Sequence, residues 1–301
     1  MVSRRLAILP SSRKRQRLID RYLNIWFALR LLGYGVLLIW GVISLVPLLM
    51  MFSLAIRPLG EVLLFPPRLI PAKVTFENFY RIIYGAATAE QFPRWVFNSF
   101  FITVPPLLLN LLFQAMAGYA FAKRRFPGRE IIFWTLMGVS MLPSQVTMVP
   151  IFLQIVRLKL MDTYWAIVLP GIGAGAAFLM RQYLSTLPDE LFDAARIDGA
   201  NEWMVFSRIV LPLAKPPLAF LGITGFIGSW NSFFWVLLVT TSDRFRTLPV
   251  GLATLYMRNR DRVDYGIAMA GSVVLAIPPI IAFFAFHQYL LQGVRIGALK
   301  G

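Results

Sequence analysis

Charged residues are scarce in this sequence and are absent from six long stretches. Only 15% of the 301 residues are Asp, Glu, Lys or Arg, 58% are hydrophobic, and the mean hydropathy is +0.67. This composition excludes an ordinary soluble domain. The stretches without any charge are residues 33–56, 97–121, 131–156, 163–180, 217–240 and 266–291. At about 1.5 Å per helical residue, each approaches or exceeds the roughly 30 Å thickness of a bilayer's hydrocarbon core.

The regular alternation of apolar and polar residues that marks a transmembrane barrel strand is also missing. In lipid every backbone polar group needs an internal partner, which leaves helices as the spanning form. The sequence therefore predicts an all-α integral membrane protein with six transmembrane helices. We expect a basic N-terminal tail at residues 1–32, followed by a six-helix transmembrane domain at residues 33–301.

Cysteine and the common catalytic motifs are missing too. Without cysteine the chain can form no disulfide, no thiol nucleophile and no thiolate metal site. Neither HExxH nor GxSxG occurs, and the single histidine allows no histidine cluster. We therefore predict no catalytic residue, no metal site and no enzymatic activity.

Acidic residues are missing from all six predicted spans, and no lysine follows a glycine. A carrier driven by an ion gradient generally needs carboxylates or broken-helix ion sites inside the membrane. An ATP-hydrolysing phosphate-binding loop needs the sequence Gly-Lys-Ser/Thr. These absences indicate that the energy for any transport comes from another subunit. A self-sufficient secondary transporter is the alternative, and a structural scaffold is a third possibility.

Basic residues are plentiful, and all of them lie outside the predicted spans. The formal net charge is +16. Eight basic residues fall in 1–32 and four in 122–130, whereas the loop 157–162, on the other side, holds two. Because basic residues collect in cytoplasmic segments, we predict that both termini and residues 181–216 lie in the cytoplasm. Topology and the anionic lipid of the bilayer explain the basic excess.

The longest amphipathic passage between two apolar runs is residues 187–212. Pro188 and Asp189 suit the first turn of a helix, and Gly199 suits a left-handed C-terminal cap. Asn201 can cap a second helix that Pro212 ends. We expect the first helix to gather Leu191, Ala194, Ala195 and Ile197 on one face. We expect the second helix to bury Trp203, Val205, Phe206, Ile209 and Val210.

Two short helices around a glycine also describe a DNA-binding helix-turn-helix. In this passage, however, five acidic residues outnumber two basic ones. A nucleic-acid surface needs a local excess of basic residues to displace counterions. We therefore predict no nucleic-acid partner.

The spacing in this passage resembles the EAA loop of binding-protein-dependent ABC importer permeases. The family pattern is EAA, three residues, Gly, nine residues, Ile, one residue and Leu-Pro, and every position but the first matches. The matching residues, with the aspartate that precedes the glycine, are Asp193, Ala194, Ala195, Asp198, Gly199, Ile209, Leu211 and Pro212. Asp193 stands where the family usually has Glu, keeping the charge on a side chain one methylene shorter. The alternative is an ordinary amphipathic loop helix.

The resemblance implies a fold, a mechanism and a set of partners. The last five spans would form the core of a type I ABC importer permease, located in the inner membrane. The loop 181–216 would dock onto an ATP-hydrolysing subunit, which binds ATP and Mg²⁺, so that this chain needs no cofactor. The complete transporter would contain a second, homologous permease, two ATP-binding subunits and an extracytoplasmic solute-binding protein.

Other segments are similar to the carbohydrate-uptake branch of these permeases. They are residues 118–129, 162–170, 229–235, 246–255 and the terminal GALKG. This likeness implies a sugar or a sugar derivative as the solute. A polyol or a glycerophosphate is the alternative within the family, and an ion-driven secondary transporter is the alternative outside it.

A polyhydroxylated solute would be bound by amides, hydroxyls and aromatic faces. Polar and aromatic residues of this kind within the predicted spans include Asn110, Gln114, Trp230 and Asn231. We take these four as candidates for the translocation path. Interhelical hydrogen bonding is the alternative role for each of them.

Overall fold

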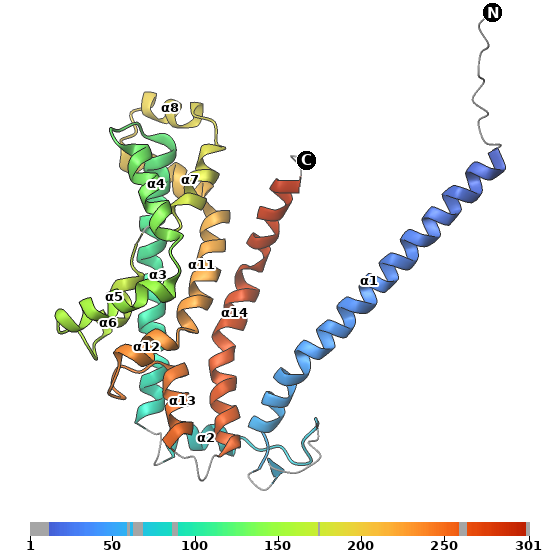
Figure 1. The fold of residues 1–301 in the computed structure, drawn as a ribbon, viewed down its shortest axis with the longest axis vertical. Coiled ribbons are helices and arrows are strands. Elements are labelled where there is room, and N and C mark those ends of the chain that lie inside the picture. Colours follow the sequence, from blue (N-terminus) through green and yellow to red (C-terminus); the bar gives the residue numbers. More distant parts are fainter. Residues whose placement is uncertain are drawn as a thin grey trace, which may run out of the picture.

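The computed structural model describes residues 12–58, 61–62, 69–85, 90–173, 175–258 and 264–298, without the side chains of 12–25, 258 and 289–298. Every regular element in these ranges is a helix, as predicted. The longer helices are α1 (Ser12–Ala55), α3 (Gln91–Lys123), α4 (Arg129–Ser140), α5 (Ser144–Arg157), α11 (Lys215–Trp230), α13 (Leu248–Arg258) and α14 (Tyr265–Ala298). Shorter helices join them (Figure 1).

Among the described residues, three helices are each long and apolar enough to cross a membrane: residues Trp26–Ala55 of α1, all of α3, and Tyr265–Gln288 of α14. They cover all or nearly all of three of the six predicted stretches, 33–56, 97–121 and 266–291. The predicted boundary at residue 33 falls inside α1, which is one continuous helix. Pro105 and Pro106 in α3 do not break it, and Pro278 and Pro279 do not break α14.

The other three predicted spans are interrupted. The stretch 131–156 is divided between α4 and α5, which meet at an angle of 98° next to Pro143. The stretch 163–180 contains α6 (Tyr164–Val168), a 3₁₀ turn η2 (Leu169–Gly171) and the start of α7 (Ala177–Ser185). Proline and glycine lie at these two breaks and interrupt the backbone ladder within an apolar run. The stretch 217–240 is divided between α11 and α12 (Phe234–Val239), and the residues between these helices include neither proline nor glycine. By length and composition the described residues provide three candidate spans, or up to five if each bent pair is one span.

The helices α3, α7, α11 and α14 pack side by side (Figure 1). The helices α3 and α7 approach each other closely, because a Cβ atom at Gly118 would lie 2.3 Å from the Cβ of Met180. Glycine permits this approach because it carries no side chain. At the other end of α3, a Cβ at Gly251 of α13 would lie 2.1 Å from the ring of the buried Trp95.

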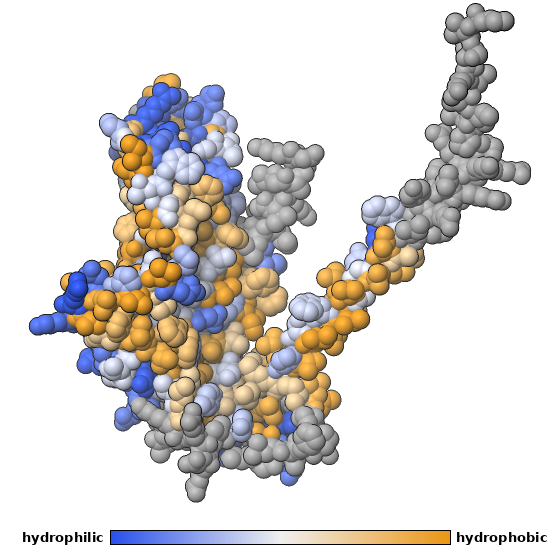
Figure 2. Space-filling model, in the orientation of Figure 1, coloured by the Kyte–Doolittle hydropathy of each residue, from blue (hydrophilic) through white to orange (hydrophobic). Residues whose placement is uncertain are grey.

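The outer surface divides by polarity in a way that fits a bilayer. Hydrophilic residues gather at the end of the molecule that carries α8 (Glu190–Ile197), and hydrophobic residues cover the helices below it (Figure 2). Apolar side chains of α1 from Trp26 to Leu49 are largely exposed. The first residues of α1 and the last of α14 lie toward the same end as α8 (Figure 1).

Candidate functional site: coupling loop and translocation path

The first helix of the predicted loop forms where its signals indicate. It is α8, Glu190–Ile197, with Asp189 at the N-cap position and Glu190 in the first turn. Gly199 follows the helix with a φ of +87°, and the Ala200 amide donates to the Ala195 carbonyl at 2.9 Å. The predicted left-handed glycine at the end of this helix is therefore confirmed.

The second helix also forms where it was predicted. The Asn201 side chain accepts a hydrogen bond from the Met204 amide at 2.8 Å, which confirms the cap. The helix runs through α9 (Glu202–Val205), a π-helical turn η3 (Phe206–Val210) and α10 (Leu211–Leu213), then bends by 73° into α11. The helix ends at Leu213, one residue beyond Pro212, so the predicted end is correct to within one residue.

An apolar core holds this loop against the transmembrane helices. Its buried members are Ala115, Tyr119, Met180, Leu184, Phe192, Val205, Phe206, Val210 and Ala214. Ile209 and Leu211 pack against its edge. Trp203, which we expected to be buried, is 61% exposed, and its ring is tilted against Phe206 at 5.7 Å. The burial expectation for Trp203 is wrong because the side chain lies on the outer face of the helix, away from α3.

The apolar face expected on α8 exists, but it points away from the protein. Leu191 is 46% exposed and Ile197 is 85% exposed, and Ala194 between them is also exposed. The helix is instead anchored by Phe192, which is 1% exposed. Asp193, Asp198, Gly199 and Pro212 are exposed as well, whereas Ala195 is half-buried. The loop thus presents an apolar strip at one end of the molecule.

Polar contacts tie both ends of α8 to the last turns of α3. Lys123 donates to the Leu187 carbonyl at 2.6 Å and to the Asp189 carboxylate at 2.5 Å. The Lys123 hydrogen bond and charge lower the pKa of Asp189. The pair therefore stabilises the folded protein at pH values above the ordinary pKa of an aspartate. This contribution is lost as the pH falls through the lowered pKa of Asp189.

Glu202 is the second point of attachment. It accepts from the Tyr119 hydroxyl at 2.8 Å, from Arg124 at 2.6 Å and from Arg196 of α8 at 3.2 Å. Arg196 also donates to Asp193 at 2.9 Å. The carboxylate that replaces the family glutamate therefore forms its ion pair within α8. Sequence reasoning missed Glu202, Tyr119 and Arg124, since no short spacing connects α3 with the loop.

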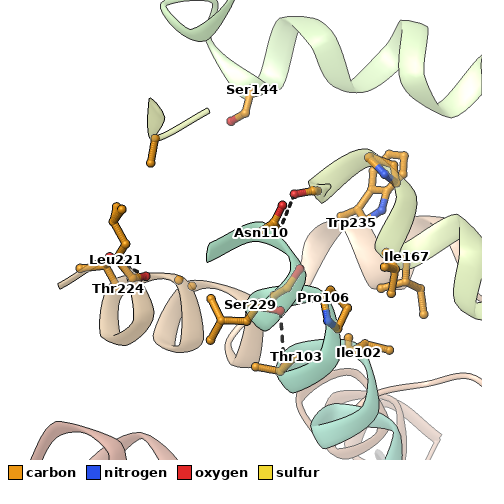
Figure 3. A pocket seen from close by; sticks show the side chains of 18 of the residues that line it. Ile102, Thr103, Pro106, Asn110, Ser144, Ile167, Leu221, Thr224, Ser229 and Trp235 are labelled. Carbon is orange, nitrogen blue, oxygen red and sulfur yellow. Dashed lines mark hydrogen bonds between the residues drawn. The ribbon is translucent and has the colours of Figure 1, made fainter. Parts of the chain in front are cut away.

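A cavity of about 730 Å³ lies between α3, α5, the η2 segment and α11. Asn110 lies at its wall, and its amide nitrogen donates to the Gly171 carbonyl of η2 at 2.9 Å (Figure 3). Its amide oxygen accepts from the Gly173 backbone amide at 2.8 Å. Gln114 lines the same cavity one turn further along α3. The hydroxyl-bearing residues that line the cavity are Thr103, Ser144, Thr147, Thr224, Ser229 and Ser232. Its described lining contains no charged residue and one indole, that of Trp235.

The other two path candidates lie elsewhere. Trp230 is 1% exposed in a separate core, and its indole donates to the Leu275 carbonyl at 2.9 Å. Asn231 is exposed at the end of α11 and does not line the cavity. The structure therefore brings together Asn110 and Gln114 but not Trp230 and Asn231. The hydroxyl-bearing residues and Trp235 come from several helices. Sequence patterns within one span therefore could not show that these residues line the same cavity.

Comparison with known proteins assigns the family. The sequence profile of the binding-protein-dependent transport system inner membrane component matches residues 96–296, and the chain belongs to this family. It is a multi-pass inner membrane protein and the permease subunit of an ABC importer, and it is not an enzyme.

Relatives named as transport permeases match most of the chain. The arabinooligosaccharide transport permease AraQ of Halalkalibacterium halodurans is 40% identical over 262 residues, 86% of this chain and 92% of the relative. The sn-glycerol-3-phosphate transport permease UgpE of Escherichia coli O6:K15:H31 is 32% identical, covering 88% and 96% of the two chains. A chain in the crystal structure of a bacterial ABC transporter that imports the acidic polysaccharide alginate matches with a TM-score of 0.75 and 26% identity, covering 90% and 97%.

Proposed function

We propose that this permease imports an uncharged sugar, of the oligosaccharide class, and that the loop 181–216 couples it to a separate ATP-hydrolysing subunit. The observation that carries the coupling role is the apolar strip of Leu191, Ala194 and Ile197 on α8. Exposed apolar side chains at the hydrophilic end of a membrane protein mark a surface for another protein. Gly199 lets the chain turn directly after this helix.

The proposed arrangement in the membrane follows from the position of this strip. With α8 in the cytoplasm, the start of α1 and the end of α14 would be cytoplasmic too, in agreement with the basic residues of 1–32 and 122–130. Because the chain has no cysteine, single cysteines at the exposed Ala194 and Ala72 can test this. We expect an impermeant thiol reagent, applied to intact cells that lack any outer barrier, to label position 72 and not position 194.

The lining of the cavity supports a neutral solute. Amide and hydroxyl groups from Asn110, Gln114 and Ser144 can pair with sugar hydroxyls, and the indole of Trp235 offers an apolar face. A phosphate group in this cavity would find no lysine or arginine among the described lining residues to pair with its charge. Glycerophosphate remains the second candidate because of the relative that transports it. Competition of a labelled arabinooligosaccharide with glycerol 3-phosphate in an uptake assay separates the two.

The proposed assembly contains a second homologous permease, two ATP-binding subunits and an extracytoplasmic solute-binding protein. No cofactor would be held by this chain itself, because ATP and Mg²⁺ would bind to the partner. The wild-type chain should co-purify with an ATP-hydrolysing subunit. Leu191→Asp should abolish this, because it places a charge in the contact, whereas Leu158→Asp, an exposed leucine outside the loop, should not. Solute uptake by the purified chain alone, driven by an ion gradient, would instead support the secondary transporter.

A further inference from the structure

A set of polar contacts links the loop to the helix that lines the cavity. Tyr119 and Lys123 belong to α3, and Arg124 directly follows it; the loop contributes Asp189, Arg196 and Glu202. We refer to these six residues as the latch. The chain itself connects α8 to α7 on one side and to α11 on the other. The latch connects it to α3 instead.

We propose that the latch makes α3 the element that carries movement of α8 to the cavity, with Tyr119 and Glu202 as its positioning residues. This proposal rests on the function proposed above, because it assumes that an ATP-hydrolysing subunit moves α8. It adds a specific route, from Glu202 through Tyr119 along α3 to Asn110.

Buried contacts at the loop end hold α8 tightly against α3. Lys123 is only 6% exposed at its side chain and lies 5.1 Å from the Phe192 ring centroid, so its charge is enclosed between α3 and α8. Tyr119 is 6% exposed and also packs beside Phe192, at 6.1 Å between ring centroids. A displacement of α8 therefore meets resistance from both hydrogen bonds and packing on α3.

The other end of the route is equally defined. From Lys123 to Asn110 α3 is one helix, about 20 Å long at 1.5 Å per residue. Asn110 bonds Gly171 and Gly173 in the irregular segment between α6 and α7. That segment has no helical ladder through Ile172 and Gly173, so that it can change shape when α3 shifts. Asn110 thus lies where a movement of α3 alters the cavity wall.

The test uses the assembled transporter in proteoliposomes with the variants Tyr119→Phe, Glu202→Gln and the double variant. Tyr119→Phe keeps the buried ring, and Glu202→Gln changes a side chain that is 47% exposed, so both should assemble. We expect the ratio of solute-stimulated to basal ATP hydrolysis to fall by about fivefold in each single variant. In the double variant this ratio should be at most about twofold lower than in the more strongly affected single variant, because both substitutions remove the same contact. Glu202→Asp, which keeps the charge, should recover part of the ratio.

Glu130→Gln is the matched control. Glu130 accepts from Arg181 at 2.8 and 3.1 Å, so this variant also removes a carboxylate from an ion pair, but one that joins α4 to α7. We expect its ratio to remain unchanged. Equal losses in Glu130→Gln and Glu202→Gln, or an unchanged ratio in both latch variants, would overturn the proposal.

A second readout follows the cavity directly. With Gln114→Cys as the single cysteine, the rate of thiol modification should change when ATP is added, and Tyr119→Phe should abolish this change. A full response in the Tyr119→Phe background would overturn the route along α3. If the wild-type chain does not bind an ATP-hydrolysing subunit, the proposed function itself is wrong. If the wild-type transporter responds to ATP and the latch variants respond equally well, only the route through the latch is wrong.

Discussion

The two ends of α3 are held by different chemistry. At the loop end, Lys123 and Arg124 pair with the carboxylates of Asp189 and Glu202, whose side chains are 78% and 47% exposed. At the opposite end, Asn98 is fully buried and its amide donates to the carbonyls of Arg244 and Arg246 at 3.0 and 2.8 Å. It also accepts from the Tyr164 hydroxyl at 2.7 Å.

The difference separates an end held by buried hydrogen bonds from an end held by packing and by ion pairs whose carboxylates face water. Exposed ion pairs contribute only about 0–1 kcal/mol each, and water can replace a broken one. Leaving a buried donor or acceptor unpaired costs about 1–3 kcal/mol per group. We therefore expect substitutions at the Asn98 end to lower stability, and substitutions at the loop end to change coupling while the protein stays folded.

Gly251→Ala should have the largest effect. The added Cβ would lie 2.1 Å from the ring of Trp95, which is 1% exposed and cannot move aside. We expect a loss of about 3 kcal/mol or more in the free energy of unfolding, seen as a strongly lowered melting temperature in detergent. Gly138→Ala in α4, where nothing lies within 4 Å of the added atom, is the control and should not lower it. Equal melting temperatures for both would show that this end is not tightly packed.

Asn98→Leu should come next. It removes three hydrogen bonds and leaves the Arg244 and Arg246 carbonyls without their buried donor. We expect a loss of about 2–3 kcal/mol, measured from the same thermal transition. The control Asn231→Leu changes an exposed asparagine and should leave the melting temperature unchanged. A stable Asn98→Leu protein would mean that this end is no more fixed than the loop end.

Gly199→Val should affect coupling more than folding. The residue has a φ of +87°, which a β-branched side chain adopts at a cost of about 1–2 kcal/mol, but no atom lies within 4 Å of the added Cβ. We expect the solute-stimulated ATP hydrolysis of the assembled transporter to fall while the permease remains folded. Gly199→Asn should retain most of this hydrolysis, because asparagine tolerates the left-handed region. If valine were as active as asparagine, the turn would not be needed for coupling.

Asp193→Glu should have the smallest effect. Asp193 is exposed, and its ion pair is with Arg196 on the same helix. The longer side chain can keep this pair, so we expect a change of less than about twofold in stimulated hydrolysis, in line with the small energy of surface pairs. A gain of tenfold would indicate that the family glutamate makes a contact that aspartate cannot reach.

Local signals in the loop predicted its backbone correctly. Gly199 and Asn201 act through their own backbone and the next three residues, and both were located from sequence. The exposure of Trp203 was not predicted. Which face of a short helix meets α3 depends on how the whole loop packs. The same limit applies to Leu191 and Ile197, whose apolar spacing indicated a face without telling whether that face turns inward or outward.

The number of spans shows a similar division. Apolar length identified α1, α3 and α14 as helices that can cross a bilayer. It could not show that the runs at 131–156 and 163–180 are broken, since Pro105 in α3 is tolerated while Pro143 stands at a 98° bend. Whether a proline breaks a helix depends on whether neighbouring elements compensate the lost hydrogen bond.

The sequence alone determined the all-helical membrane class, the position of the loop and the conformation of its turn, because hydropathy and backbone preferences act over a few residues. The tertiary structure decided which residues meet. It joined Tyr119 to Glu202 across 83 positions, and Asn110 to Gly171 across 61. Such pairs form only when helices pack, since hydrogen bonds and close contacts act over a few ångströms and take no account of distance along the chain.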